Sequence, residues 1–390
     1  QEGSGCVCGP TIFRWRGIMN GLVLCTQECN LRCSYCFEES MHTGCMPTID
    51  EIKNKFASFI ENGFEKFVIE LIEINRKLDR DTDVTFHGGE PMLIGVPLLR
   101  KAFEIVKKFD NTTISMQSNG TLITDEMIAL LKEFDVRVGI SIDGPKEMHD
   151  AYRLNKARGG SFNIVFENIN KLKKAGVIVG GLATVTDQTI KNPEKFYYFF
   201  KENKLDYSFN PLFIDPNKPS GCDSLNVNDY IEFYKRMFEL WINDNDGYQS
   251  IQCFERIMSA MGVKKNIFME VCTYIPDCSK TTVAIDTNGD FYRCLHYCMD
   301  QKNCIGNIRK DSLEKALGDK MFAKRFDYLQ KVLCKDCDIQ EYCCGGCPYV
   351  AESINGTIMS KSSTCKSQYA IVHYIYNYMQ KYLKKNENAL

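Results

Sequence analysis

The chain has 390 residues, of which 44% are hydrophobic and 25% are charged, and its formal net charge is −2. This length predicts a large catalytic domain with an appendage, and the near-neutral charge excludes the electrostatic footprint of a nucleic-acid-binding protein. No apolar run is long enough to cross a membrane, and the opening sequence, QEGSGCVCGP, lacks the basic and apolar regions of a secretory signal. We therefore expect a cytoplasmic protein that has neither a nucleic acid nor a membrane as its partner.

Short apolar runs alternate with amphipathic stretches over the first half of the chain, after a lead-in that we assign to residues 1–17. Six strands that alternate with helices predict a parallel sheet of βαβ units. Six units are too few for a closed eight-stranded barrel, so the predicted fold is α/β, an open (β/α)6 partial barrel over residues 18–215. The expected strands are Gly21–Leu24, Val84–His87, Thr113–Gln117, Val136–Ile142, Val177–Val185 and Tyr207–Phe213, and the expected helices are Ile49–Ile60, Leu98–Phe109, Asp125–Phe134, Phe162–Lys174 and Pro193–Lys201.

The second half of the chain begins with a segment rich in Pro, Asn and Gly, at Ile214–Cys222, which predicts a linker. The aromatic residues near the C-terminus recur at helical spacing, and we expect them to pack against the body of the protein. The predicted segments are a helical bridge over residues 216–270 with helical patterns at Val227–Trp241 and Gln252–Phe268, a cysteine-rich domain over 271–366, and a C-terminal helix over 367–390 with its pattern at Gln368–Lys384.

The twenty cysteines fall into two groups, Cys6–Cys45 and Cys222–Cys365, with none between them. A disulfide scaffold would not leave the middle of the chain bare, and a protein of this size does not need disulfides to fold. Metal ligation in a reducing cytoplasm explains the distribution better.

The stretch CNLRCSYC holds three of these cysteines, Cys29, Cys33 and Cys36. Thiolates are the preferred ligands of iron–sulfur centres. A [4Fe–4S] cubane has four irons, so three cysteines leave one iron with an open coordination position. The alternatives are buried free cysteines or a zinc site that lacks a ligand, but a structural zinc site normally has four ligands.

This CxxxCxΦC pattern, with Tyr35 before the last cysteine, resembles the signature of the radical S-adenosylmethionine (radical SAM) superfamily. The resemblance implies that the amino and carboxylate groups of S-adenosylmethionine chelate the open iron. It also implies that one electron cleaves the sulfonium to a 5′-deoxyadenosyl radical, which abstracts a hydrogen atom from the substrate. The cofactors supply this chemistry, and the protein positions them.

The sequence His-Gly-Gly-Glu ends the second expected strand, at the side of the barrel where active sites lie. Gly88 and Gly89 allow a close approach of the backbone to a ligand. They resemble the GGE motif of the superfamily, which implies that the backbone and the carboxylate of Glu90 hold the amino group of S-adenosylmethionine.

Polar residues also follow the third and fourth expected strands. The resemblance implies that Ser118, Asn119 and Ser141 contact the ribose and carboxylate of the cofactor, although such residues also cap turns. Arg153 is a candidate partner for the cofactor carboxylate, with a solvated or salt-bridged arginine as the alternative. Tyr35 is a candidate neighbour of the adenine.

A second array of cysteines contains the run CKDCDIQEYCCGGC. Eight cysteines close two four-ligand sites, which two structural zinc ions would also fit. The array resembles the SPASM extension of radical SAM proteins, which implies two auxiliary [4Fe–4S] clusters and three clusters in total. In that arrangement the first auxiliary cluster has Cys272, Cys278, Cys294 and Cys347 as ligands, and the second has Cys334, Cys337, Cys343 and Cys365. Most of the other nine cysteines are expected to be small core residues.

The combination is similar to anaerobic sulfatase-maturating enzymes and to maturases of ribosomally made peptides. It implies a radical SAM/SPASM maturase that installs a modification in a peptide or protein, with a flavodoxin or ferredoxin as reductant. We favour a thioether or carbon–carbon crosslink, or another oxidation, over formylglycine formation from Cys or Ser. A small-molecule SPASM oxidoreductase is another alternative, and a non-enzymatic redox relay is disfavoured because the first site has three cysteines rather than four.

Two residues depart from the sulfatase-maturating pattern, in which an Asp proposed as the base follows a cysteine of the first auxiliary site. That position is Leu295, which cannot accept a proton. The residue before GGE is His87 rather than Gln. The catalytic residue is therefore unknown, with His87, His296 and Cys298 as candidates. If residues 295 and 296 lie on a strand, their side chains face opposite ways, so His296 would not replace the missing base.

Overall fold

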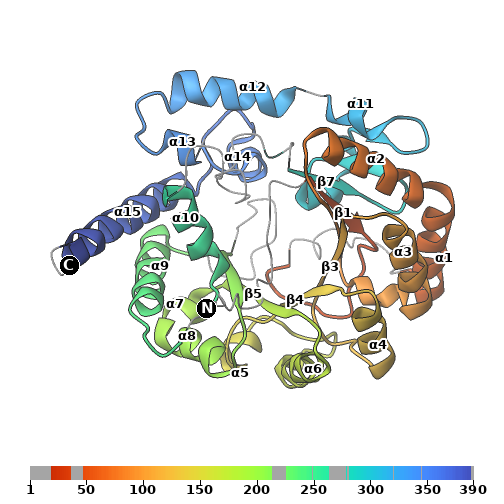
Figure 1. Ribbon diagram of the computed structural model, residues 1–390, viewed down its shortest axis with the longest axis horizontal. Coiled ribbons are helices and arrows are strands. Elements are labelled where there is room, and N and C mark those ends of the chain that lie inside the picture. Colours follow the sequence, from red (N-terminus) through yellow and green to blue (C-terminus); the bar gives the residue numbers. More distant parts are fainter. Residues whose placement is uncertain are drawn as a thin grey trace, which may run out of the picture.

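The computed structural model describes residues 19–36, 47–212, 225–247, 249–262, 278, 281–318, 320–343 and 345–387. Within this part of the chain nine strands form one sheet in the order β6-β5-β4-β3-β2-β1-β7-β8-β9 (Figure 1). Strands β1 to β7 pair in parallel, and β8 and β9 pair antiparallel. The bounds are β1 Asn20–Leu24, β2 Thr82–His87, β3 Thr112–Ser118, β4 Arg137–Ser141, β5 Val179–Val185, β6 Tyr207–Pro211, β7 Thr282–Ile285, β8 Asp290–Tyr292 and β9 Gly306–Asn307.

Helices form the outer layer of an open arc around the first six strands, and helices of the C-terminal part lie across its open side (Figure 1). No helix among the described residues is both long enough and apolar enough to cross a membrane. The helices of the arc are α1 Ile49–Phe59, α2 Glu65–Lys77, α3 Val96–Lys107, α4 Asp125–Glu133, α5 Lys146–His149, α6 Phe162–Ala175, α7 Asp187–Ile190 and α8 Pro193–Glu202. Later helices are α9 Val227–Ile242, α10 Gln252–Gly262, α11 Leu313–Leu317, α12 Met321–Tyr328, α13 Gln340–Cys343, α14 Pro348–Asn355 and α15 Cys365–Glu387.

The predicted α/β fold, a partial (β/α)6 barrel, is confirmed, and each expected strand and helix has its counterpart. Helix α4 begins as its sequence indicates, because the Thr124 hydroxyl accepts a hydrogen bond from the Met127 N–H at 3.2 Å. The sequence prediction missed α2, which continues α1 through a π-helix, η2 (Ile60–Phe64). It also missed β7, β8 and β9. The expected linker, Ile214–Cys222, and the lead-in, residues 1–17, lie outside the described residues.

The C-terminal strands join the barrel at its first strand. β1 pairs with β2 on one side and with β7 on the other, in parallel and in register from Asn20↔Thr282 to Val23↔Ile285. Both β1 and β7 are largely buried. A single sheet therefore carries both halves of the chain, and the loop after β1 lies at its centre.

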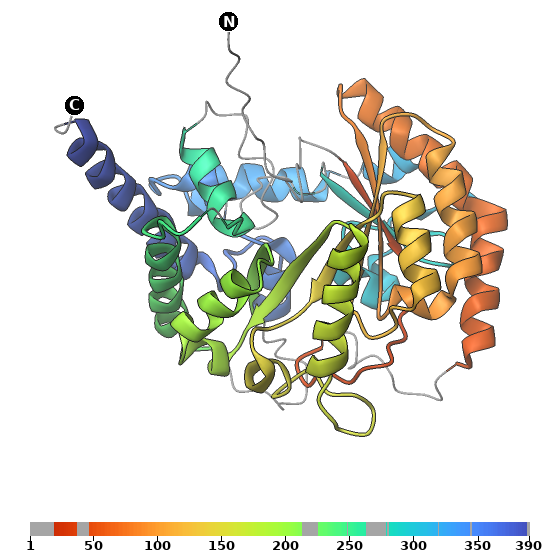
Figure 2. The ribbon, with the colours of Figure 1, turned by 60° about the horizontal axis from the view of Figure 1, so that its bottom comes forward.

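The long C-terminal helix α15 packs against α9, along one side of the molecule (Figure 2). The ring of Tyr378 meets Phe238 edge to face at 5.5 Å, and the Tyr374 hydroxyl donates to the Glu239 carboxylate. The expected packing of this aromatic stripe is confirmed. The helix begins at Cys365, three residues before its predicted start.

Candidate active site

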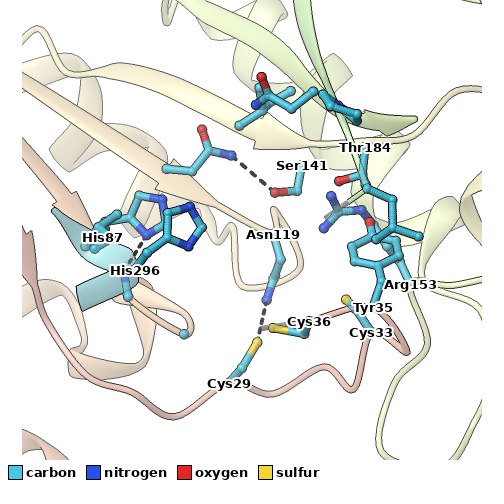
Figure 3. A pocket seen from close by; sticks show the side chains of 18 of the residues that line it. Cys29, Cys33, Tyr35, Cys36, His87, Asn119, Ser141, Arg153, Thr184 and His296 are labelled. Carbon is cyan, nitrogen blue, oxygen red and sulfur yellow. Dashed lines mark hydrogen bonds between the residues drawn. The ribbon is translucent and has the colours of Figure 1, made fainter. Parts of the chain in front are cut away.

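A cavity of about 350 Å³ opens at the carboxyl ends of the barrel strands. It is lined by the loop after β1, by the ends of the following strands, and by two segments of the C-terminal part, η7 (Leu295–Met299) and α14 (Figure 3). Parallel strands end at the same edge of a sheet, so residues far apart in sequence meet here. The cavity contains most of the predicted site residues.

The cysteine loop forms one wall of this cavity, and Cys29, Cys33 and Cys36 all line it. Backbone hydrogen bonds hold the loop to the segment between α5 and α6, from Arg32 N to Leu154 O at 2.7 Å and from Ser34 N to Tyr152 O at 3.0 Å.

The donor set of this loop fits a cationic cluster. The pKa of the Cys29 thiol is raised to about 12, mainly by burial, and the charges of Glu90, Cys33 and Cys36 contribute to this shift. Three adjacent thiolates therefore need positive charge to stabilise them, which the irons of a cluster supply. No group of three or more His, Cys, Asp or Glu side chains within the described ranges converges on a single metal ion. A cubane instead binds each cysteine through a different iron.

The packing of the backbone around Gly88 and Gly89 requires glycine at both positions. A Cβ at Gly88 would lie 2.2 Å from the carbonyl oxygen of Thr26, and one at Gly89 would lie 2.2 Å from that of Glu28. The end of β2 therefore packs directly under the segment that leads into the cysteine loop, and Gly89 N donates to Thr26 O at 2.9 Å. Both glycines also line the cavity, so these contacts fix their backbone where it faces a ligand.

Glu90 has no exposed surface, and its carboxylate is bonded by the protein. It accepts hydrogen bonds from Asn119 N at 2.8 Å, Met92 N at 3.0 Å and the Ser118 hydroxyl at 2.9 Å. Burial raises its pKa to about 7. Its carboxylate therefore links the end of β2 to the end of β3 beneath the cavity, whereas Ser118 and Asn119 line the cavity itself. Direct contact of Glu90 with the cofactor remains a prediction.

Asn119 and Ser141 point into the cavity from the ends of β3 and β4 (Figure 3). The Asn119 side-chain amide donates to the Cys29 sulfur at 3.5 Å and to the side-chain oxygen Oδ1 of Asn30 at 2.9 Å. The Ser141 hydroxyl accepts a hydrogen bond from Gln117 Nε2 at 3.2 Å. These contacts hold donor and acceptor groups around the cysteine loop.

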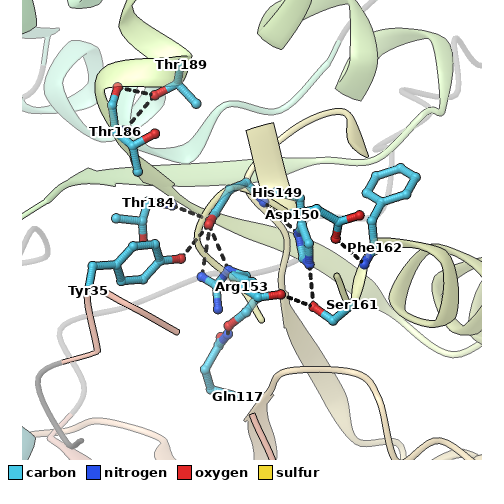
Figure 4. Close-up of polar contacts among 12 residues, drawn as sticks. Tyr35, Gln117, His149, Asp150, Arg153, Ser161, Phe162, Thr184, Thr186 and Thr189 are labelled. Atoms are coloured by element: carbon cyan, nitrogen blue, oxygen red, sulfur yellow. Dashed lines mark hydrogen bonds and ion pairs between the residues drawn. The ribbon is translucent and has the colours of Figure 1, made fainter. Parts of the chain in front are cut away.

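Arg153 forms a buried ion pair with Asp143, a residue that the sequence did not single out. The guanidinium donates to the carboxylate at 2.9 and 3.1 Å, and Thr184 N donates to it at 2.8 Å. The Tyr35 hydroxyl donates to the same carboxylate, and the guanidinium lies 5.4 Å from the centre of the Tyr35 ring (Figure 4). The salt-bridged alternative for Arg153 is thus the one observed. Arg153 and Tyr35 also line the cavity.

Two imidazoles, His87 and His296, face the cavity from different halves of the chain. Figure 3 shows them close together, across the cavity from Tyr35 and Arg153. Burial lowers the pKa of His87 to about 4, and the nearby His296 lowers it further. The ring of His296 stacks on Tyr349 of α14, with centroids 4.7 Å apart.

The expectation that Leu295 and His296 face opposite ways is wrong. These residues begin η7, a 3₁₀-helix, and both side chains line the cavity. Strand alternation does not apply to a helical turn, where successive side chains are about 120° apart. Cys298, the third catalytic candidate, is buried in a hydrophobic cluster and does not line the cavity. No Asp or Glu among the described residues lines it either.

A second cavity, of about 390 Å³, lies behind His296 and Tyr349. It is lined by Cys278, Cys294 and Cys347, three of the four ligands predicted for the first auxiliary cluster. The fourth, Cys272, lies outside the described residues. Three thiols around one cavity fit the predicted cluster, as its cysteines bind different irons.

The four cysteines predicted for the second auxiliary cluster are all described. Burial raises the pKa of the Cys343 thiol to about 12, and the charges of Cys365, Cys334 and Cys337 add to this effect. The four thiols are thus close enough to interact, although their sequence positions span three elements. Such a set fits a four-thiolate cluster, in which each cysteine binds a different iron, better than a single zinc ion, on which no three described side chains converge.

Comparisons with known proteins agree with this geometry. The chain matches the radical SAM superfamily model over residues 23–199 and the SPASM iron–sulfur cluster-binding domain model over residues 272–338. A cysteine-type anaerobic sulfatase-maturating enzyme of Clostridium novyi is 32% identical over 333 residues, which cover 83% of this chain and 85% of that protein. A serine-type enzyme of Bacteroides thetaiotaomicron is 30% identical over 386 residues, which cover 92% and 89%.

Solved structures share the fold. Native anSMEcpe with bound AdoMet and Kp18Cys peptide has a TM-score of 0.78 at 25% identity and covers 94% of this chain and 99% of its own. Streptococcus suis SuiB bound to precursor peptide SuiA has a TM-score of 0.64 at 14% identity and covers 89% and 76%. The chain belongs to the radical SAM/SPASM maturases, the family of iron–sulfur enzymes that includes the anaerobic sulfatase-maturating enzymes.

Proposed function

We propose that this enzyme modifies a peptide or protein by an oxidation other than formylglycine formation, such as a thioether or carbon–carbon crosslink. The observation that carries this proposal is the composition of the main cavity. Leu295 lines it, and none of its described lining residues is an Asp or Glu. Formylglycine formation removes a proton from the substrate hydroxyl or thiol as well as a hydrogen atom, so a site for that reaction benefits from a positioned base.

The cofactors of this reaction are S-adenosylmethionine and three [4Fe–4S] clusters. Cys29, Cys33 and Cys36 would hold the first cluster, and Gly88, Gly89 and the side chains around them would hold S-adenosylmethionine. When bound, the pair supplies a 5′-deoxyadenosyl radical that takes a hydrogen atom from the substrate. The Asp143–Arg153 pair holds Tyr35 beside this site, and Asn119 orients Cys29. The auxiliary clusters have the two cysteine sets given above as ligands, and a flavodoxin or ferredoxin is the electron donor.

The part of the cavity lining that we assign to the substrate is mainly apolar. Leu182, Leu212, Val350 and Ile354 contribute to it, with His87, His296 and Ser353 as polar groups. Two of its segments, η7 and α14, follow directly after Cys294 and Cys347, which are proposed ligands of the same auxiliary cluster. Binding of that cluster therefore also positions this wall.

Formylglycine formation is the second candidate, because two relatives with at least 30% identity are sulfatase-maturating enzymes of the cysteine and serine types. For a Cys substrate the two candidates differ in the mass of the product. Oxidation of Ser to an aldehyde also removes two hydrogens, so a reagent that labels aldehydes separates it from a crosslink. The reduced enzyme is incubated with S-adenosylmethionine and either Cp18Cys, Kp18Cys or short peptides encoded near its gene. Loss of two hydrogens that leaves an internal crosslink supports the proposal, and conversion of Cys or Ser to an aldehyde contradicts it.

A variant sharpens this test. Leu295→Asp adds a carboxylate to the cavity wall, and Val350→Asp adds one to α14 as a matched control. We expect aldehyde formation on Cp18Cys from Leu295→Asp only. Aldehyde formation by the unchanged protein would favour the second candidate, and turnover of small metabolites alone would contradict both.

A further inference from the structure

His87 is held in one orientation by the backbone of the next residue. The N–H of Gly88 donates a hydrogen bond to Nδ1 of His87, with the two nitrogens 2.7 Å apart. Nδ1 therefore carries a lone pair and no hydrogen. The backbone of Gly88 has a φ of 126° and packs against Thr26, so this hydrogen bond is held in place.

This contact fixes the tautomer of the ring. The imidazole is neutral near pH 7, since burial lowers its pKa to about 4. A neutral imidazole has one N–H, and the hydrogen bond made by one nitrogen determines which nitrogen carries it. With Nδ1 as the acceptor, the hydrogen is on Nε2. The group that His87 offers is therefore a donor.

This donor is available to a molecule bound in the cavity. No described residue accepts a hydrogen bond from Nε2, and no described Asp or Glu lines the cavity. His87 lies beside His296 and across the cavity from Tyr35 and Arg153, on the side of the SPASM segments (Figure 3). This is the wall that we assign to the substrate, and the most abundant acceptors of a peptide are its backbone carbonyl groups.

We propose that His87 is a positioning residue whose Nε2–H donates a hydrogen bond to a backbone carbonyl of the peptide substrate, and that it is not the proton acceptor of the reaction. The choice of acceptor rests on the proposed function, in which the substrate is a peptide. The assignment of the tautomer does not rest on the proposed function, because it follows from contacts within the chain. His87 thus helps to select an extended peptide over a ligand that has no carbonyl at this place.

The first experiment measures the tautomer without any peptide. The holoenzyme is labelled with ¹⁵N at its histidine side chains, of which the chain has five, and the His87 signals are assigned by their loss in His87→Gln. We expect the ¹⁵N shifts of a neutral ring protonated at Nε2 at pH 7. A ring protonated at Nδ1, or at both nitrogens, overturns the inference whatever the substrate is.

The second experiment separates a donor from a base. His87→Gln keeps a side-chain N–H donor but cannot accept a proton at neutral pH, and His87→Met removes the donor at similar volume. With Cp18Cys as the probe and the oxidised enzyme saturated with S-adenosylmethionine, we expect Met to weaken peptide binding about 3- to 10-fold, and Gln by less than about 2-fold. Iron content is measured in both variants, so that loss of a cluster is not mistaken for loss of the hydrogen bond.

Other outcomes overturn the assignment. Equal loss of turnover in both variants, with unchanged peptide affinity, would identify His87 as a base. Wild-type affinity in His87→Met would show that no hydrogen bond to the peptide exists. If Cp18Cys and Kp18Cys both fail to bind the unchanged protein while a small metabolite is turned over, the proposed function fails, and with it the assigned carbonyl acceptor. The tautomer result would still stand.

Discussion

The carboxylate of Asp143 and the guanidinium of Arg153 form an ion pair at 2.9 and 3.1 Å, with 1% and 10% of their side-chain surfaces exposed. The same carboxylate accepts hydrogen bonds from Tyr35 and from the backbone of Thr184. One buried anion thus joins the cysteine loop to β5 and to the segment after β4. Its removal would leave a cation without its partner inside the protein.

We expect Asp143→Asn to lower the free energy of unfolding by about 3–5 kcal/mol, the usual cost of breaking a buried ion pair. Affinity for S-adenosylmethionine should fall as well, because Tyr35 loses its acceptor. Chemical unfolding and equilibrium binding under anaerobic conditions measure the two effects. The control is Glu314→Gln, which breaks the exposed 2.8 Å pair with Lys77 and should cost less than about 1 kcal/mol. Equal stabilities of the two variants would contradict the role of Asp143.

Gly89→Ala tests the close approach beneath the cysteine loop. The new Cβ would lie 2.2 Å from Glu28 O, so that segment must move and carry Cys29 with it. We expect loss of about four irons, one cubane, with the auxiliary sites retained. Gly356→Ala is the control: its φ is 69°, so it costs about 1 kcal/mol of strain, but nothing lies within 4 Å of the added Cβ. Full iron content in Gly89→Ala would refute this coupling.

Metal analysis tests the cluster assignments. Anaerobic reconstitution should give about twelve irons and twelve sulfides per chain, as expected for three cubanes. The double variant Cys334→Ser/Cys337→Ser should retain about eight. Cys304→Ser, which changes a cysteine outside the three predicted sets, should retain all twelve. About four irons with two zinc ions in the unchanged protein would show that the later cysteines bind zinc.

Glu90 makes stability depend on pH in a defined direction. Burial raises its folded-state pKa from 4.5 to about 7, so the folded protein binds more protons than the unfolded one between these values. The contribution of Glu90 to the free energy of unfolding is fully present below about pH 4.5. It is lost as the pH rises to 7, and the loss amounts to about 3 kcal/mol. The neutral Glu90→Gln should lack this loss. Melting temperatures of both proteins from pH 5 to pH 8 measure it, and parallel profiles would contradict it.

Much of the barrel could be predicted because its signals are local. The strand at Thr113–Gln117 is a short run between turn residues, and α4 has a capping threonine directly before its apolar positions. The strands β7 to β9 were missed because they are two to four residues long and take their stability from pairing with β1 and with each other. The partner of β7 in the barrel, strand β1, lies more than 200 positions away in the sequence, and no local pattern reveals that pairing.

The site divides in the same way. Cysteine spacing and the GGE sequence located the cavity, because a metal cluster and a tight turn both need fixed residue types at fixed separations. Asp143 was missed, since its importance comes from Arg153 and Tyr35, which reach it from different segments. The side of Leu295 and His296 was mispredicted because a strand was assumed where the chain forms a helical turn. The available signal for Asp143 was its place in the sequence Ser-Ile-Asp-Gly-Pro, at the mouth of the barrel.

The parallel pairing of β1 with β7 has a consequence for how the chain can be divided. Asn20 to Val23 would become an open sheet edge if the residues after 262 were removed, and exposed edges of apolar strands invite aggregation. The boundary between the two family models is therefore not a place to cut. In a fragment that ends there, the cysteine loop would follow a strand that has lost one of its two neighbours. We expect such a fragment to associate through intermolecular strand pairing and not to act as an independent small catalyst.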